Sequence, residues 1–313
     1  MTSEGAAPPR LCAVSVDLDE IPFYRQIHGL DGAGAAADHA VFDVALPRLA
    51  ELAQALSIPL TLFVIGETVS RRENKDKLRS MAAAGHEIGN HSLGHRYDLT
   101  RLPEDVMKAE VEGAQRAIEE AVGVRPVGFR APGYTITDAL FRLLEEVGFL
   151  YDSSVFPCPA YWALKGSAMS LIRLRGRRSH SVLDTPKVLL APRRPYRIGH
   201  PYWVRGEGPL ELPIQVTPGP RLPFFGTAIT AAGPRGARWL SRMVVGEPLV
   251  NIELHGIDVL SESDGLAPLA KHQHDLKIPL ARKLESLTAV VDTLRAAGYG
   301  FVRLDQAARA FAS

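Results

Sequence analysis

The sequence predicts an α/β protein with a parallel sheet covered by helices. Short apolar runs alternate with stretches of helical periodicity along most of the 313 residues, which is typical of βαβ units. The composition, with 46% hydrophobic and 23% charged residues, is that of an ordinary globular protein. Polar residues follow several of the expected strands. In closed parallel barrels this edge of the sheet carries the chemistry.

Local sequence features predict where the strands and helices begin and end. The apolar run Leu11 to Asp17 predicts a buried first strand, and Pro47 marks a kink or boundary in the helical stretch after it. Gly85 ends the second helix, whereas Glu104 and Asp105 suit the positive N-terminal end of the third. Strands are expected at 11–17, 60–65, 86–92, 126–130, 149–152, 210–216, 249–255 and 300–304, and helices at 38–56, 74–84, 103–122, 137–147 and 278–297.

Composition excludes several classes of protein. A formal net charge of +1 argues against a generally basic nucleic-acid binder, so no nucleic-acid partner is expected. No run approaches the roughly 18 apolar residues of a spanning helix, and residues 1–10 lack the pattern of a secretory signal. Cys12 and Cys158 cannot form a disulfide framework. We therefore expect a cytoplasmic protein with a disordered N-terminus (1–10) and a single domain over 11–313.

The near-neutral total conceals a basic insert, placed at 157–209. Between Lys165 and Arg205 the sequence holds ten Lys/Arg and one acid, a net +9 that leaves −8 for the rest. Residues 161–174 have aromatic residues at one end, apolar residues in the middle and cations at the other. This pattern favours peripheral contact of 161–178 with an anionic bilayer, or a helix packed on the barrel with a solvated basic tail.

Two acidic and two histidine residues follow the first and third strands. Asp17 and Asp19 alternate along an extended chain and share a side, where two close carboxylates need a cation or a shared proton. His91 and His95 are spaced so that both can face one metal ion. Each pair alone is weak evidence, since acidic pairs also cap helices and an HxxxH is often accidental.

Three further strand ends carry unusual polar groups. Arg130 can fix a carboxylate and is followed by a loop with Pro132 and Tyr134, while Asp152 and His255 each end a strand. Together with one Asp and two His, these groups fill the roles of metal-assisted amide hydrolysis: an open metal site, a base and an acid.

In this order the motifs resemble those of the NodB-like polysaccharide deacetylases, carbohydrate esterase family four. The matching segments are Asp17 with Asp19, His91 to His95, Arg130-x-Pro132-x-Tyr134, Asp152 to Phe156, and Leu254-His255. The resemblance covers roughly residues 11–304 and implies a distorted (β/α)7 TIM-like barrel, here with a basic insert.

The resemblance also implies a role for each residue. Asp19, His91 and His95 would bind one divalent metal ion, most commonly zinc, with cobalt, nickel or manganese as other ions. Asp17 would be the general base positioned by Arg130. The backbone N–H of Tyr134 would hold the oxyanion, and His255, supported by Asp152, would protonate the leaving amine.

The sequence departs from the family pattern at two positions. The usual Asp-Asp pair is Asp-Leu-Asp here, which leaves Glu20 as another candidate for approaching the metal. Phe156 replaces the usual Trp, so the wall facing the acyl group would differ. We expect Pro132, Phe156 and Trp203 to contact substrate, whereas the sequence does not place His28, His272 and His274.

The predicted function is metal-dependent removal of an N-acyl group, acetyl or formyl, from an amino sugar. Because no export signal is recognised, the substrate could be linked to a polyprenyl phosphate at the cytoplasmic membrane face, as for lipid-linked aminosugar deformylases. The alternatives are an allantoinase-like hydrolase of cyclic amides or ureides and a non-catalytic sugar- or lipid-binding barrel. The oligomeric state is left open.

Overall fold

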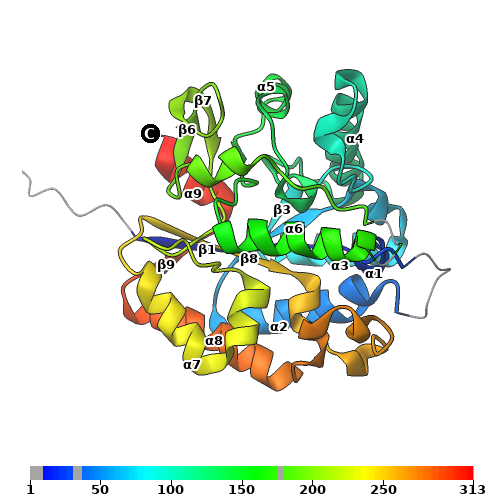
Figure 1. Cartoon of the computed structure of the whole chain (residues 1–313), viewed down its shortest axis with the longest axis vertical. Coiled ribbons are helices and arrows are strands. Elements are labelled where there is room, and N and C mark those ends of the chain that lie inside the picture. Colours follow the sequence, from blue (N-terminus) through cyan, green and yellow to red (C-terminus); the bar gives the residue numbers. More distant parts are fainter. Residues whose placement is uncertain (1–9, 31–36, 175, 177–178, 313) are drawn as a thin grey trace, which may run out of the picture.

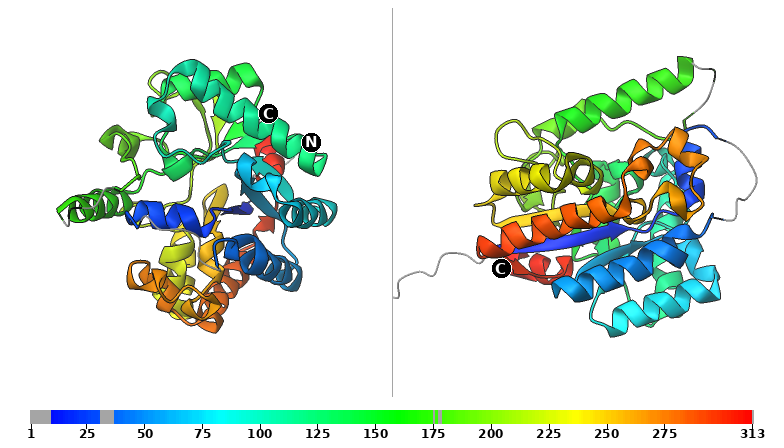
Figure 2. Two further views of the ribbon diagram at one scale, coloured as in Figure 1. Left: turned by 90° about the vertical axis from the view of Figure 1, so that its right-hand side faces the viewer. Right: turned by 90° about the horizontal axis from the view of Figure 1, so that it is seen from below.

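The computed structural model describes residues 10–30, 37–174, 176 and 179–312. The expected disordered N-terminus therefore lies, except for Arg10, outside the described residues. In the described part the α/β prediction is confirmed: helices surround a curled sheet whose strands are mostly parallel (Figures 1 and 2). The strands are β1 (Leu11–Asp17), β2 (Leu60–Val64), β3 (Glu87–Asn90), β4 (Gly128–Phe129), β5 (Tyr151–Asp152), β6 (Tyr196–Ile198), β7 (Arg205–Glu211), β8 (Leu249–His255) and β9 (Gly300–Phe301).

The α-helices lie mainly between these strands in the chain. They are α1 (Ile21–Ile27), α2 (Leu46–Leu56), α3 (Arg72–Ala83), α4 (Glu104–Val122), α5 (Asp138–Val147), α6 (Pro159–Leu174), α7 (Gly226–Val244), α8 (Leu280–Ala296) and α9 (Leu304–Ala312). A π-helical turn, Val41–Ala45, runs directly into α2 and ends just before Pro47, so the expected boundary at this proline is confirmed.

Seven parallel strands form the barrel, in the order β7-β5-β4-β3-β2-β1-β8. Antiparallel β6 pairs with the edge of β7, and β9 pairs with the start of β1. The chain after β7 crosses to β8, where the Gln215 N–H donates to the Asn251 carbonyl at 3.0 Å. This bond joins the two ends of the curled sheet, as the distorted barrel prediction requires.

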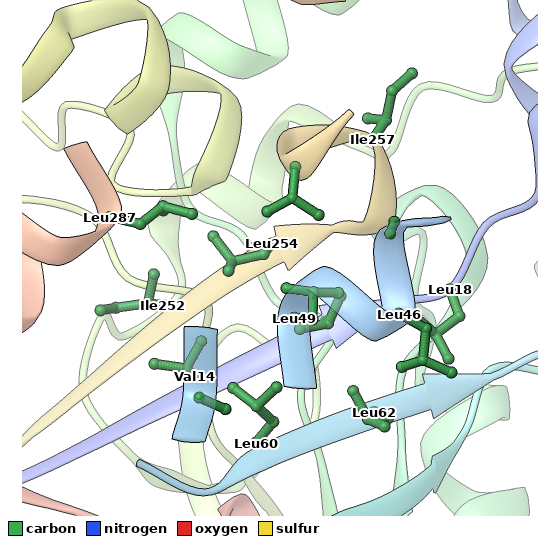
Figure 3. Packing of buried hydrophobic residues seen from close by; sticks show 14 of the residues in the cluster. Val14, Leu18, Leu46, Leu49, Leu60, Leu62, Ile252, Leu254, Ile257 and Leu287 are labelled. Carbon is green, nitrogen blue, oxygen red and sulfur yellow. The ribbon is translucent and has the colours of Figure 1, made fainter. Parts of the chain in front are cut away.

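Alternation along the strands separates a helix-facing core from a polar interior. In β1, Val14 and Val16 point outward and pack with strand residues such as Leu254 and with α2 and α8 (Figure 3). Ser15 and Asp17 therefore point into the barrel, and in β8 the same rule turns Asn251, Glu253 and His255 inward. Full burial of each large apolar side chain stabilises the folded state by about 1.5–3 kcal/mol. A one-residue shift in strand pairing would turn these side chains to the other face, so the core also fixes which polar residues point into the barrel.

Helix α9 closes the amino-terminal end of the barrel. Its Leu304, Ala307 and Ala308 pack with Ala13 and Tyr151 inside the strands. The sequence predicts a strand up to residue 304, whereas β9 ends at Phe301 and a helix follows. Leu304, the last apolar residue of the expected strand, therefore belongs to α9, the helix that closes this end of the barrel.

Other elements also differ from the prediction, since α1 and β6 lie where no helix or strand was expected. Helix α7 was not predicted because Gly233 (φ 69°) and Pro234 interrupt its helical pattern, yet the chain resumes the same helix after this kink. Strand β7 begins at Arg205 rather than 210, because it pairs with β6 across a hairpin. The last residues of the expected 157–209 insert thus belong to a barrel strand.

We expect Asn251→Ala to lower the free energy of unfolding by about 2–3 kcal/mol, measured by urea denaturation. The buried Asn251 amide donates to Ser153 Oγ (2.9 Å) and to the carbonyls of Leu212 (3.0 Å) and Pro213 (3.3 Å). Without it, these acceptors lose a partner at the point where the barrel closes. The exposed Gln54→Ala is the control, with a change below about 0.5 kcal/mol. An equally small change for Asn251→Ala would contradict the closing role.

Candidate active site

The polar strand ends meet at the carboxyl-terminal edge of the sheet. Asp17 is the register partner of His255 in the neighbouring strand, and Asn90, just before His91, is the partner of Phe129, just before Arg130. Parallel pairing therefore brings together residues that lie more than 200 positions apart in the chain.

The first cluster consists of Asp19, His91 and His95. Asp19 Oδ1 lies 3.3 Å from Nε2 of both histidines, and all three side chains are buried. Their donor atoms lie within 4.8 Å of one another. The His91 Nδ1 bonds to the Arg130 carbonyl at 2.7 Å, which makes this nitrogen the N–H donor and leaves the lone pair on Nε2 facing Asp19. The expected ligand trio is thus assembled.

The cluster carries the electrostatic signature of a buried ion site. Burial alone would raise the pKa of the Asp19 carboxyl, but His95 and His91 hold this pKa well below its usual range. Burial lowers the pKa of His95, whereas Asp17 and Asp19 outweigh burial and raise that of His91. Among the described residues, Asp19 Oδ1 and both ring nitrogens of His95 are buried without a hydrogen-bond partner. A divalent cation fits this donor set, because it would satisfy these atoms and balance the buried carboxylates.

Asp17 stands beside this trio with one oxygen fixed and one oxygen free. Its Oδ1 accepts a hydrogen bond from Arg130 Nη1 at 2.7 Å. Its Oδ2 lies 3.7 Å from His91 Nε2 and, in the described part of the chain, has no hydrogen-bond partner although it is buried. The free oxygen therefore faces the same space as the trio.

His255 lies next to Asp17 on the neighbouring strand, and donor atoms of Asp17, Glu253 and His255 lie within 4.8 Å of one another. Its Nε2 lies 3.8 Å from Asp19 Oδ2 and 3.3 Å from the Tyr134 hydroxyl, while Nδ1 lies 2.9 Å from Glu253 Oε1. Burial acts to lower the pKa of His255, but Glu253 outweighs it and raises this pKa well above its usual value. An imidazolium at this place can donate a proton through Nε2.

The expected support of His255 by Asp152 is wrong, because Glu253 occupies that position. Tyr151 points into the barrel and donates its hydroxyl to Glu87, so alternation turns Asp152 to the other face. There Asp152 accepts hydrogen bonds from Ser154 N and Oγ, and burial together with the neighbouring Asp152 carboxyl raises the pKa of Glu211 well above its usual value. Glu253 could have been found from the sequence, since polar residues at 251, 253 and 255 alternate with apolar ones in β8.

The turn after Arg130 also differs in detail from the expectation. Pro132–Tyr134 form a short 3-10 turn in which Gly133 and Tyr134 have positive φ angles of 61° and 59°. The Tyr134 N–H donates to the Ala131 carbonyl at 3.0 Å, so the expected oxyanion donor is engaged within the turn. It is the phenol of Tyr134, rather than its backbone, that points to His255.

The three residues expected to contact substrate do not lie together. Phe156 is buried against Tyr134 and Tyr161, with ring centroids 5.8 and 4.9 Å apart, and forms an aromatic wall behind His255. Pro132 is buried in the turn. Trp203 lines a separate hollow of about 370 Å³.

A pocket of about 620 Å³ opens beside His95. Its walls mix acids and cations, among them Glu20, Arg71, Arg96 and Asp98. Glu20 lies on this wall with Oε1 3.0 Å from His39 Nδ1, so Asp19 and not Glu20 joins the histidine pair. His28 and His272 lie together, with ring centroids 5.8 Å apart, and His274 begins a short 3-10 turn.

Comparison with known proteins agrees with this geometry. The family model for polysaccharide deacetylase matches residues 38–151. A peptidoglycan deacetylase of Helicobacter pylori is 27% identical over 150 residues, which cover 46% of this chain and 49% of that protein. A peptidoglycan-N-acetylglucosamine deacetylase of Bacillus cereus is 30% identical over 103 residues, which cover 33% and 46%. The matched region thus spans about half the length of these relatives.

Solved structures share the fold. A chain from Mycobacterium smegmatis assigned to the polysaccharide deacetylases superposes with a TM-score of 0.52 at 22% identity and covers 95% of both chains. A carbohydrate esterase family four pseudoenzyme from Bacillus anthracis gives 0.50 at 14% identity and covers 96% of this chain and 66% of its own. The matched family region contains His91, His95 and Arg130, and the shared fold places Asp17, Asp19 and His255 around them. Residues 38–151 are therefore similar to the polysaccharide deacetylase family, and the whole chain shares the fold of these solved structures.

Proposed function

We propose that this protein is a metal-dependent hydrolase that removes an N-acyl group from an amino sugar. One observation carries the proposal: the free Oδ2 of Asp17 faces the buried trio Asp19, His91 and His95. A base beside a metal-type donor set is the arrangement that amide hydrolysis needs. Similarity to peptidoglycan and chitin deacetylases supports an N-acylated sugar as substrate.

The trio would hold one divalent ion. Two imidazoles and one carboxylate leave an open coordination position and favour zinc, while cobalt, nickel and manganese accept the same ligands. When bound, the ion supplies Lewis acidity toward the acyl carbonyl and lowers the pKa of water. The Nδ1 bond from His91 to the Arg130 carbonyl fixes the tautomer that such binding requires.

Two residues of the chain, on neighbouring strands, carry out the two proton transfers. Asp17, held by Arg130 through Oδ1, takes a proton from the attacking water at Oδ2. His255, held by Glu253 through Nδ1, donates a proton from Nε2 to the leaving amine. The Tyr134 hydroxyl, 3.3 Å from that nitrogen, positions the ring. The base and the acid thus approach the acyl group from different strands.

The acyl group in this proposal is acetyl or formyl. The exposed residues of α6 support a substrate that is linked to a lipid carrier at the cytoplasmic membrane face. Its Leu164, Leu171 and Leu174 are 69%, 48% and 84% exposed, and the first two lie on one face two turns apart. Arg173 is exposed next to them, whereas Arg175, Arg177 and Arg178 lie outside the described residues. Leucines flanked by cations suit the interface of an anionic bilayer.

The aromatic end of α6 faces the protein. Tyr161 packs on Phe156, and Trp162 Nε1 donates to the Asp184 carbonyl at 3.0 Å. No helix in the described residues combines the length and apolarity of a membrane span. The contact we propose is therefore peripheral and is made by the outer face of α6.

We expect the wild-type chain, stripped by chelator and reloaded, to bind one zinc ion per chain by elemental analysis. Asp19→Asn should weaken zinc binding by about 100-fold, because it removes the carboxylate shared by both histidines. Asp17→Asn should keep the ion, since Asp17 is the base and not a ligand. The exposed Asp292→Asn is the matched control. Equal zinc affinity in the wild type and Asp19→Asn would refute the assigned trio.

We expect the zinc-loaded protein to release acetate or formate from N-acyl amino sugars, detected by mass spectrometry of free and lipid-linked substrates. Asp17→Asn should reduce turnover by at least about 100-fold, whereas Asp292→Asn should not. Hydrolysis of hydantoins or imides, without hydrolysis of acyl sugars, would favour the alternative of an allantoinase-like hydrolase. Binding of sugars without any hydrolysis would favour a non-catalytic barrel.

We expect co-sedimentation with phosphatidylglycerol-rich vesicles but not with neutral ones. Replacing Leu164 and Leu171 by Glu should lower the vesicle-bound fraction by about tenfold, because two exposed leucines that would enter the membrane interface become charged. Leu190→Glu is the matched control, since Leu190 is 67% exposed in the same insert but lies off α6. Vesicle binding that survives the double substitution would remove α6 from the contact.

A further inference from the structure

The turn that carries Tyr134 is held at its start by the barrel. The Ala131 N–H donates to Ser154 Oγ at 2.8 Å, and Ala131 directly follows Arg130, whose guanidinium is bonded within the barrel. The end of the turn, at Gly133 and Tyr134, contacts helix α6 of the insert. The contacts at that end help to decide where the phenol of Tyr134 points.

The end of the turn is conformationally strained. Tyr134 has a φ of 59°, a left-handed conformation that costs free energy for a residue with a side chain and persists only where neighbouring contacts enforce it. Gly133 has a φ of 61°, and a Cβ atom there would lie 3.1 Å from Tyr97 Cδ1 and 3.4 Å from Lys165 Nζ. Glycine therefore permits both the turn and the close approach of this lysine.

Helix α6 supplies contacts that hold the strained end. Lys165 Nζ donates to the Gly133 carbonyl at 2.9 Å and lies 5.7 Å from the ring centroid of Tyr161, one turn earlier on the same helix. Tyr161 in turn packs on Tyr134, with ring centroids 5.7 Å apart. Two residues four positions apart on one helix face therefore contact the turn, one at its backbone and one at its ring.

The bond from Lys165 also acts on the hydrogen bond that closes the turn. The Gly133 carbonyl and the Tyr134 N–H belong to one peptide unit, and this N–H donates to the Ala131 carbonyl at 3.0 Å. A cation on the carbonyl oxygen polarises the peptide and strengthens its N–H as a donor. Burial lowers the pKa of Lys165 to about 8, so the amine is mostly protonated at pH 7 and can act in this way.

The turn connects this bond to the reactive centre. The Tyr134 hydroxyl lies 3.3 Å from His255 Nε2, the atom from which the leaving amine would be protonated. We propose that Lys165 is a positioning residue, which holds the Gly133–Tyr134 peptide and thereby keeps the phenol against His255. The inference rests on the proposed function and assigns one cation of the basic insert to the organisation of the active site.

Kinetics of the zinc-loaded full-length protein on an N-acyl amino sugar test this role. Lys165→Met keeps most of the length of the side chain and removes its charge. It should lower kcat at least about tenfold and change KM less than about twofold, because the proton donor loses its orientation while substrate contacts remain. Lys108→Met, the same substitution at an exposed position of α4, should behave as the wild type does. An unchanged kcat for Lys165→Met would overturn the inference.

Chemical rescue separates positioning from a general loss of folding. Lys165→Cys should show the same loss of kcat. Alkylation of the introduced thiol with 2-bromoethylamine rebuilds a lysine-like side chain and should restore most of kcat, with complete alkylation verified by mass spectrometry. The same treatment should leave the wild type unchanged, because Cys12 and Cys158 are buried. A fully alkylated variant without recovery of kcat would contradict the positioning role.

Amide hydrogen exchange measures the contact without turnover. In zinc-loaded Lys165→Met, residues 130–135 should exchange at least about fivefold faster than in the wild type, while β1 and β8 should not change. Equal acceleration in β1 and β8 would indicate general destabilisation and overturn the positioning role.

Failure of the inference and failure of the proposed function give different results. Faster exchange confined to the turn in Lys165→Met, with no acyl release by the wild type, would leave the contact standing and refute the hydrolase. Acyl release by the wild type, with kcat and exchange unchanged in Lys165→Met, would refute the positioning role alone.

Discussion

The buried guanidinium of Arg130 is the interaction on which the rest of the site depends. It is fully buried and donates to Asp17 Oδ1, Ser15 Oγ and both the carbonyl and the hydroxyl of Ser153 at 2.7–2.9 Å. Its Cζ also lies 4.2 Å from the centroid of Phe63. Because an unpaired buried charge costs several kcal/mol, these partners are constrained to converge. One side chain thus ties together strand ends from three places in the sequence.

The position of the guanidinium also gives the two carboxylate oxygens of Asp17 different roles. The guanidinium uses Oδ1 and leaves Oδ2 free toward His91. A carboxylate with both oxygens bonded would be a purely structural acceptor. One with neither oxygen fixed would lack the orientation that proton transfer requires. The asymmetry is what makes Asp17 a better candidate for the base than Asp152, whose two oxygens are bonded to Ser154.

Much of this site could be predicted because parallel strands obey simple rules. The first and eighth strands match their expected bounds, and period-two alternation places Asp17 inside the barrel. The common carboxyl-terminal edge then brings His91 and His95 to Asp19. Local spacing suffices here because each residue lies on, or shortly after, a strand that the sequence predicts.

The remainder depends on contacts that no local pattern encodes. Whether Asp152 or Glu253 supports His255 is decided by which face of a two-residue strand turns inward, and a run of two residues has no readable period. Helix α7 escapes prediction because Gly233 and Pro234 break its pattern, yet packing against α8 restores it. The hollow around Trp203 requires the insert to fold back on the barrel.

The insert also shows why net charge is an incomplete guide. The net charge of +9 between Lys165 and Arg205 suggests one continuous cationic surface, but several of these cations are paired within the fold. Arg193 and Arg194 pair with the buried Glu247, and Lys165 bonds the Gly133 carbonyl beside the reactive centre. What is left for a partner is narrower: the outer face of α6 with Arg173 and its leucines. On the inner face of the same helix, Tyr161 packs on Tyr134 and Lys165 donates to the Gly133 carbonyl. The same helix thus presents its leucines outward and contacts, through its inner face, the turn that carries Tyr134.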